Sequence, residues 1–186
     1  MSQHRPSERY AAASIVLHWL MLALLVAVYA AIELREFYPR GSAVREGLKT
    51  WHYMLGLSVF VLVWLRIVAR LVLPGPGPIE AGWRRVLSRI VHAALYALMI
   101  GMPVAGWLLL SAEGDAIPFF GLELPPLVAV NEALAGRVEG VHELGGTIGY
   151  WLIGLHAAAA LFHHYILRDG LMARMLPRRS VANLGN

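Results

Sequence analysis

Four stretches of the chain are each apolar for about twenty residues, and this pattern constrains the fold more than any other feature. They cover roughly residues 11–32, 51–73, 90–111 and 141–167. A run of this length spans a bilayer as a helix, which satisfies its own backbone hydrogen bonds. The composition agrees, because only 15% of the 186 residues are charged, against about 25% in soluble domains. We predict an all-α transmembrane four-helix bundle, with residues 1–186 forming a single integral membrane domain.

The connections between the apolar runs carry residues that break helices. The segment "PGPGPIEAG" follows the second run, and "IPFFGLELPP" lies in the longest connection, residues 112–140. Proline and glycine at this density end a helix, so we expect the longer connection to be an irregular surface segment. The first apolar run is too long for a cleaved signal peptide and lacks a small-residue cleavage site, so it is expected to remain as a span.

Positive charge is unevenly divided between the two ends of the predicted bundle. One side carries 11 arginines, namely Arg5, Arg9, Arg66, Arg70, Arg84, Arg85, Arg89, Arg168, Arg174, Arg178 and Arg179. The other side carries 5 basic residues, namely Arg35, Arg40, Arg45, Lys49 and Arg137. Lys and Arg concentrate on the cytoplasmic side of membrane proteins. We therefore expect both termini to be cytoplasmic.

Four histidines lie inside these spans at depths that match in pairs. Ionisable side chains in a bilayer are costly and usually face the bundle interior for a functional reason. His142 and His156 are fourteen residues apart, which on a helix is about 21 Å along one face. With cytoplasmic termini, His52 lies at the outer depth of His142, and His18 lies at the inner depth of His156. The sequence thus predicts two stacked histidine pairs.

Two such pairs suit two haems, each with an imidazole on both faces of the iron. Filling both axial positions favours electron transfer over oxygen binding. The chain has no cysteine, so the haems would be non-covalent haem b. Zinc or copper is an alternative, but the set offers no thiolate and does not gather at one depth. A haem-free transporter with a histidine proton relay is another alternative.

Glycines accompany these histidines on the same helix faces. Gly145 and Gly149 follow His142 at positions i+3 and i+7, and Gly56 follows His52 at i+4. Missing side chains there leave room for a flat macrocycle, so Gly145 and Gly149 are candidate cofactor-binding residues. The alternative is that the Gly-x-x-x-Gly spacing serves close helix packing alone.

Other polar residues of the spans are candidates for supporting roles. Arg66 reaches the depth of the inner haem and would pair with a propionate, or else anchors the helix at the membrane surface. His92 starts the third span on the inner side, where it would hydrogen-bond a haem propionate, contact a quinone or serve packing alone. We favour a role without ligation and treat His92 as a candidate cofactor-binding residue. His163 shares the face of His156 and is a candidate for binding quinone or moving a proton, the alternative being an interfacial histidine. His164 points elsewhere and receives no role.

Several segments resemble the bacterial cytochrome b561 family. They are "SIVLHWL", "WHYMLGLSVFVLVWLRIVARL", "HAALYALMIGMPVAG", "HELGGTIGYWLIGLHAAAALFHHY" and "MLPRR", which together cover nearly the whole chain. The resemblance implies a dihaem protein of the bacterial inner (plasma) membrane. It implies that His18 and His156 hold the inner haem iron and that His52 and His142 hold the outer one. It further implies oxidation of superoxide outside the membrane, with ubiquinone as the acceptor.

A basic segment precedes His52 on the outer side. Arg35, Arg40, Arg45 and Lys49 would steer a small anion such as superoxide toward the outer haem. Three glutamates balance them to a net charge of +1, so they also suit a merely solvated loop. The alternative function is a haem b subunit that takes electrons from a partner dehydrogenase or hydrogenase. The expected partners are therefore superoxide, ubiquinone, membrane lipid and, under that alternative, a redox protein, with no nucleic acid.

Overall fold

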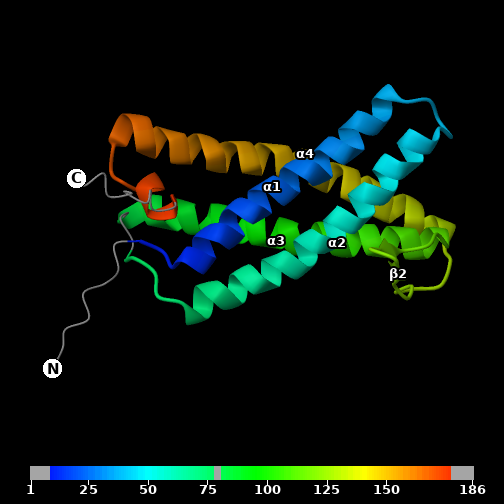
Figure 1. Ribbon diagram of the computed structural model, residues 1–186, viewed down its shortest axis with the longest axis horizontal. Helices are drawn as coiled ribbons and strands as arrows, with labels where there is room; N and C mark the ends of the chain where they lie inside the picture. The colour runs from blue at the N-terminus through cyan, green and yellow to red at the C-terminus, as the bar shows by residue number, and fades with distance from the viewer. Residues whose placement is uncertain (1–8, 78–80, 177–186) are drawn as a thin grey trace, which may run out of the picture.

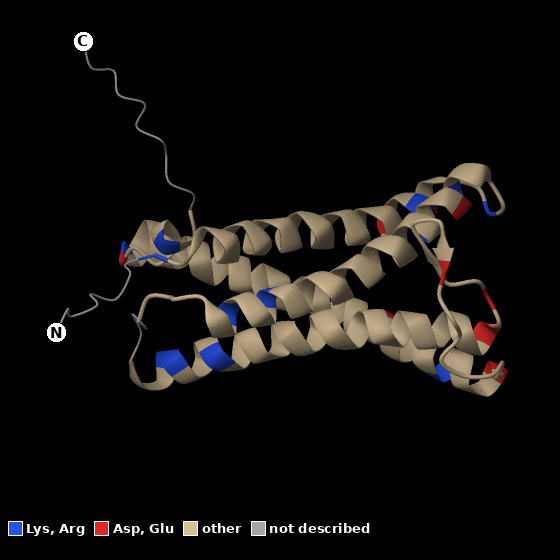
Figure 2. Cartoon of the chain, turned by 60° about the horizontal axis from the view of Figure 1, so that its bottom comes forward, with Lys and Arg blue, Asp and Glu red and all other residues tan. Residues whose placement is uncertain are grey.

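The computed structural model describes residues 9–77 and 81–176 and consists of four long helices side by side (Figure 1). They are α1 (Ala12–Leu34), α2 (Ala43–Val72), α3 (Gly82–Glu113) and α4 (Glu132–Phe162). All four are long and apolar enough to cross a membrane. Charged residues gather at the two ends of the bundle, and the middle contains few of them (Figure 2). The predicted transmembrane four-helix fold is confirmed.

Three of the helices begin earlier than the apolar runs indicate. Helices α2 and α3 each start eight residues before the predicted spans, and α4 starts nine residues before its span. The N-termini of α2 and α4 are capped by side chains, whereas Ala81 at the start of α3 has no side-chain cap. The Ser42 side chain accepts a hydrogen bond from the Arg45 amide, and the Asn131 side chain accepts one from the Leu134 amide. Hydropathy marks the part of a helix that lies in lipid, whereas the helix itself continues beyond it.

Helix α1 packs mainly on α2, and α3 packs mainly on α4, with α2 also against α3. Buried side chains from α1, α2 and α3 form the central core, namely Met21, Val59, Leu62, Val63 and Met99. Large apolar side chains also cover the outside of the bundle, including Leu71 and Trp151, which are 79% and 77% exposed. An apolar exterior is what a lipid environment requires.

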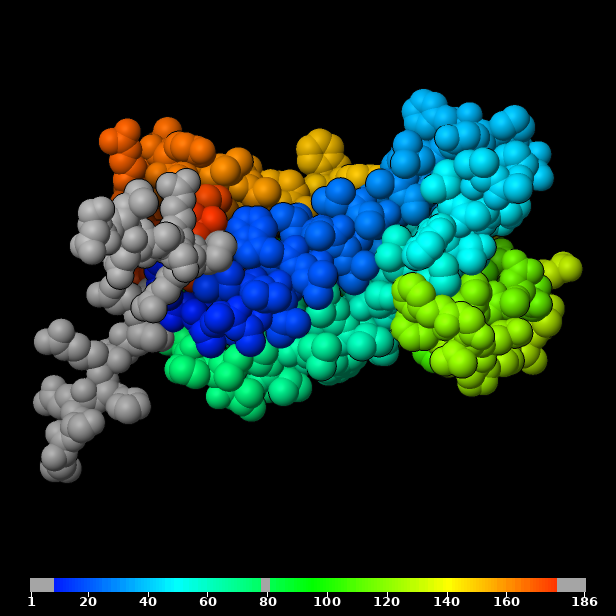
Figure 3. Space-filling model, in the orientation of Figure 1, coloured from blue at the N-terminus to red at the C-terminus, as the bar shows by residue number. Residues whose placement is uncertain are grey.

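The long connection after α3 folds over one end of the bundle. It contains a two-stranded antiparallel hairpin of β1 (Pro118–Phe119) and β2 (Leu122–Glu123), turning at Gly121 with φ +86°. Ile117 is buried against Leu57 and Leu110, and the Trp51 ring lies edge-on to Phe120. Figure 3 shows this segment lying against the first turns of α2. The expected surface segment is therefore an ordered cover rather than an irregular loop.

At the opposite end, the chain after α4 returns to the start of α1. Helix α4 continues as a π-helical turn, η2 (His163–Leu167), and ends at Arg168 in the left-handed region with φ +52°. The short 3₁₀ helix η3 (Met172–Met175) follows, and the Trp19 indole donates to the Met175 carbonyl at 2.7 Å. Another 3₁₀ turn, η1 (Arg35–Phe37), joins α1 to α2 at the far end. Arg5, Arg178 and Arg179, used in the charge comparison, lie outside the described residues.

Candidate metal centres

Four intramembrane histidines meet as two pairs. The rings of His52 and His142 have their centroids 6.2 Å apart, and so do the rings of His18 and His156. Each pair joins α4 to a helix of the first half of the chain, α2 in one case and α1 in the other. These are the pairs that the depth comparison predicts. Their role as iron ligands stays a prediction.

The spacing within each pair fits a metal ion held between two imidazoles. Two metal–nitrogen bonds of about 2 Å, together with the distance from each nitrogen to its ring centre, add up to about 6 Å. The observed 6.2 Å is compatible with that sum in both pairs, and it is also the separation of an edge contact between rings such as Phe60 and Trp64. A direct hydrogen bond between the rings would bring them closer together. The donor set, two neutral nitrogens with no thiolate, also suits a haem iron.

His52 is held in the orientation that a metal ligand needs. Its Nδ1 lies 3.1 Å from the Val28 carbonyl of α1. A carbonyl only accepts, so Nδ1 carries the proton and the lone pair remains on Nε2. Ligating histidines usually donate their second nitrogen in this way.

His142 has a buried ring nitrogen that the described chain does not satisfy. Its Nδ1 is buried and has no hydrogen-bond partner among the described residues. The ring lies beside Gly106 of α3, where a Cβ would be only 3.2 Å from its Cε1. Buried polar atoms normally have partners. The described residues leave this Nδ1 without a partner, and the opposite ring nitrogen, Nε2, is the one that would bind iron.

His18 makes a contact that differs in kind from the contact of His52. The Arg66 guanidinium lies 3.0 Å from His18 Nδ1. Guanidinium only donates, so this Nδ1 carries a lone pair rather than a proton. A neutral histidine that binds iron through Nε2 has its proton on Nδ1. The Arg66 contact and iron ligation by a neutral His18 therefore exclude each other, and Arg66 needs another acceptor when iron is bound.

The glycines divide into two groups. A Cβ at Gly145 would lie 2.4 Å from Met102 Sδ, and one at Gly149 would lie 2.1 Å from Tyr29 Oη. The absence of a side chain at these two positions lets side chains of α3 and α1 approach α4 closely. This is the arrangement expected if the Gly-x-x-x-Gly spacing serves helix packing. Gly56 instead faces open space, with nothing described within 4 Å. A cofactor role for Gly145 and Gly149 stays a prediction.

His92 lies beside the inner pair. Its ring centroid is 5.2 Å from that of His156, and its Nδ1 is 2.6 Å from the Ser88 carbonyl. Among the described residues, no group of three or more His, Cys, Asp or Glu side chains is arranged to hold a metal ion. The role of His92 beside the cofactor stays a prediction.

His163 is tied to the turn that follows α4. Its Nδ1 pairs with the Asp169 carboxylate, which also accepts a hydrogen bond from the Leu171 amide at 3.0 Å. Partial burial acts to raise the pKa of Asp169, but these hydrogen bonds outweigh it and place the pKa below its ordinary value of 3.8. A quinone or proton role for His163 stays a prediction.

The basic residues at the outer end are largely paired. Arg35 and Arg45 both contact the Glu36 carboxylate, at 2.9 and 3.0 Å, and Lys49 lies 3.4 Å from Glu46. Arg40 has no ion pair among the described residues. Paired surface charges produce a weaker field than free ones. Superoxide steering by this segment stays a prediction, with Arg40 its least compensated member.

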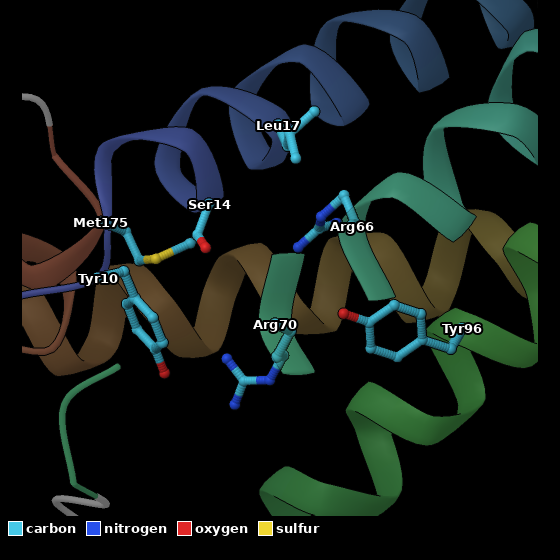
Figure 4. Close-up of a pocket in the computed structure, with 7 residues that line it drawn as sticks. All are labelled: Tyr10, Ser14, Leu17, Arg66, Arg70, Tyr96 and Met175. Atoms are coloured by element: carbon cyan, nitrogen blue, oxygen red, sulfur yellow. The ribbon is translucent and has the colours of Figure 1, made fainter. Parts of the chain in front are cut away.

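A polar pocket next to His18 was not predicted from the sequence. It lies between α1, α2, α3 and η3, and its lining residues are Tyr10, Ser14, Leu17, Arg66, Arg70, Tyr96 and Met175 (Figure 4). The one available signal was the placement of Arg66 and Arg70 four residues apart, on one face of a helix. The aromatic and hydroxyl members come from distant segments and follow no spacing rule.

Four membrane-length helices with two facing histidine pairs place the chain in the class of membrane-spanning helical bundles. The family model for prokaryotic cytochrome b561 matches residues 9–178, and the chain belongs to this family. It is accordingly a b-type cytochrome that takes part in electron transfer within a membrane.

Three relatives align over almost their full length. "Cytochrome b561 homolog 1" of Escherichia coli (strain K12) is 35% identical over 92% of this chain and 99% of the relative. "Probable superoxide oxidase CybB" of Yersinia pestis is 34% identical over 92% and 98%. "Cytochrome b562" of Cereibacter sphaeroides is 30% identical over 91% and 96%. The predicted family is thus confirmed.

Proposed function

We propose that this protein is a dihaem cytochrome of the bacterial inner membrane that oxidises superoxide outside the membrane and reduces ubiquinone. The observation that carries the proposal is the pair of 6.2 Å histidine contacts, one in each half of the bundle. The name of the relative from Yersinia pestis supports superoxide as the donor. Both termini would be cytoplasmic, which puts the His52–His142 pair on the outer side.

The histidines would hold the cofactors and limit their chemistry. His52 and His142 would hold the iron of the outer haem, and His18 and His156 would hold that of the inner one. Ligation by two histidines would favour electron transfer over oxygen binding. Bound haem supplies reversible one-electron transfer, and the protein sets its position and surroundings. The Val28 carbonyl fixes the tautomer of His52.

The overall reaction balances between the two sides of the membrane. Two superoxide anions each give up one electron and leave as dioxygen. One ubiquinone takes up those two electrons and two protons. Arg40 and its basic neighbours would raise the local concentration of the anion at the outer end. At the inner end, His163 would supply or relay protons, with Asp169 holding its ring in place.

A second function is favoured by the pairing of the outer basic residues. Arg35, Arg45 and Lys49 are each compensated by a glutamate, which lowers their attraction for a free anion. A surface of alternating charges instead suits contact with a protein. In this case the chain would be an electron-transfer subunit that receives electrons from a dehydrogenase or hydrogenase.

Stopped-flow spectroscopy on the purified protein separates the two functions. Oxidised protein in detergent is mixed with superoxide, with and without a short-chain ubiquinone, and the haem absorption is followed. Rapid reduction by superoxide, followed by reoxidation with quinone, is the result the proposal expects. Arg40→Gln should slow the first step and flatten its salt dependence, whereas Arg137→Gln is the control. No reduction by superoxide alone would contradict the enzyme and favour the subunit.

A further inference from the structure

The pocket beside His18 contains two arginines and no acid. Arg66 and Arg70 extend from α2 toward Ser14 and the ring of Tyr10, and the Tyr96 hydroxyl points into the same space (Figure 4). The pocket residues include no Asp or Glu, and neither arginine has an ion pair with any described carboxylate. Two guanidinium groups four residues apart on a helix repel each other. Such a site calls for an anion.

The contacts that the arginines do make are weak substitutes for an anion. Arg66 lies 6.0 Å from the centre of the Tyr96 ring, and Arg70 lies 5.3 Å from that of Tyr10. Cation–π contacts stabilise a guanidinium but leave most of its five N–H donors without an acceptor. Carboxylate and phosphate oxygens match this planar set of donors best.

The Arg66 contact with His18 adds a second, independent argument. It requires a lone pair on His18 Nδ1, whereas a neutral His18 bound to iron carries a proton there. Loading the inner site therefore frees Arg66. The freed guanidinium already lines the pocket together with Arg70, so an anion bound in this pocket would lie within reach of both guanidinium groups.

We propose that this pocket binds the propionate carboxylates of the inner haem, and that Arg66 passes from His18 to a carboxylate as that haem is bound. Ser14 lies one helical turn before His18 on α1, so the pocket is adjacent to the ligand. Arg70 joins Arg66 as a carboxylate donor, and the hydroxyl groups of Tyr10, Ser14 and Tyr96 complete the site. The inference rests on the proposed ligation by His18 and His156.

The test compares haem with its dimethyl ester, in which both carboxylates are blocked. The full chain carrying His52→Ala and His142→Ala, which leaves only the inner pair, is reconstituted with each compound in neutral and in anionic lipid vesicles. Haem should bind roughly tenfold or more tightly than the ester, as expected for hydrogen bonds to a charged group. Arg66→Gln and Arg70→Gln should each reduce this preference, whereas Arg84→Gln on α3 should keep it.

A redox titration of the haem-loaded protein provides a readout independent of binding. Removal of a positive charge beside a haem disfavours the added electron. Arg70→Gln should therefore lower the midpoint potential of the inner haem, and Arg70→Lys should restore most of it. This second measurement covers the case in which Arg66→Gln does not fold.

Three results would overturn the inference. If all variants preferred haem over its dimethyl ester to the same extent, the haem carboxylates would lie outside this pocket. A second such result is that haem and its ester bind equally and that the arginine substitutions have an effect only in anionic vesicles. This result would assign the pocket to a lipid phosphate. An unchanged midpoint potential in Arg70→Gln would remove Arg70 from the site. If neither compound bound to the intact inner pair, the proposed ligation itself would have failed, which is a distinct outcome.

Discussion

At the scale of single residues, the two helix partners of α4 differ in what contacts the histidine Nδ1, a Val28 carbonyl at His52 and the Arg66 guanidinium at His18. Helical periodicity and the direction of each span place His142 opposite His52 and His156 opposite His18 without knowledge of the structure. The Val28 carbonyl that orients His52 lies on another helix, and the sequence offers no signal for it. The same holds for Arg66, whose depth was predictable but whose contact with His18 Nδ1 was not.

Gly149 provides a test of helix packing at this scale. A Cβ there would lie 2.1 Å from the Tyr29 hydroxyl, which donates to the Gly146 carbonyl at 3.0 Å. Gly149→Ala should therefore destabilise the protein by about 1–3 kcal/mol, seen as a lower midpoint of thermal unfolding in detergent. Tyr29→Phe removes the obstructing oxygen, so the double variant should regain part of the loss.

Gly154 on the same helix is the control for that variant. It faces open space, with nothing described within 4 Å, and alanine is the better helix former. Gly154→Ala should be neutral or slightly stabilising. If Gly149→Ala and Gly154→Ala lowered the midpoint of thermal unfolding equally, the contact with Tyr29 would not explain the loss of stability.

At the scale of elements, hydropathy located all four helices but not their beginnings. The polar first turns of α2 and α4 depend on capping by Ser42 and Asn131, and such caps lie outside any apolar window. The hairpin after α3 was also missed, because its strands are only two residues long and its order comes from packing on α2 and α3. Short elements of this kind depend on tertiary contacts rather than on local pattern.

The turn after α4 is predicted to loosen in acid. The hydrogen bonds from His163 and Leu171 outweigh burial and lower the pKa of Asp169 below 3.8. A carboxyl with a depressed pKa stabilises the fold fully above its unfolded-state pKa, and this contribution disappears as the pH falls through the lower folded-state value. Hydrogen-exchange protection of the Leu171 amide should therefore fall below about pH 3.8 and be independent of pH above it.

The variant Asp169→Asn is the control for this titration. It keeps an oxygen that can accept from Leu171 but removes the titrating group. Protection in the variant should be lower than in the wild type near neutral pH and should not change between pH 3 and 5, the range in which an Asp titrates. A variant that loses protection at the same pH as the wild type would show that another group controls the turn.

At the scale of the whole molecule, the bundle is a frame that holds two histidine pairs at separate depths. Helix α4 supplies one histidine to each pair, fourteen residues apart, while α1 and α2 supply the partners. Charged residues cap both ends of the bundle and leave its middle apolar (Figure 2). The chain belongs to a family of b-type cytochromes, and under the proposed function the two pairs would hold two haems between which electrons cross the membrane.

The number of haems per polypeptide tests this account most directly. A pyridine haemochrome assay on the detergent-purified protein should give two haems b for the wild type. His156→Ala and His52→Ala should each give about one, because each variant breaks a different pair. A well-folded wild type with one haem or none, or a single histidine variant that loses both haems while its helices remain intact, would contradict the two-site arrangement.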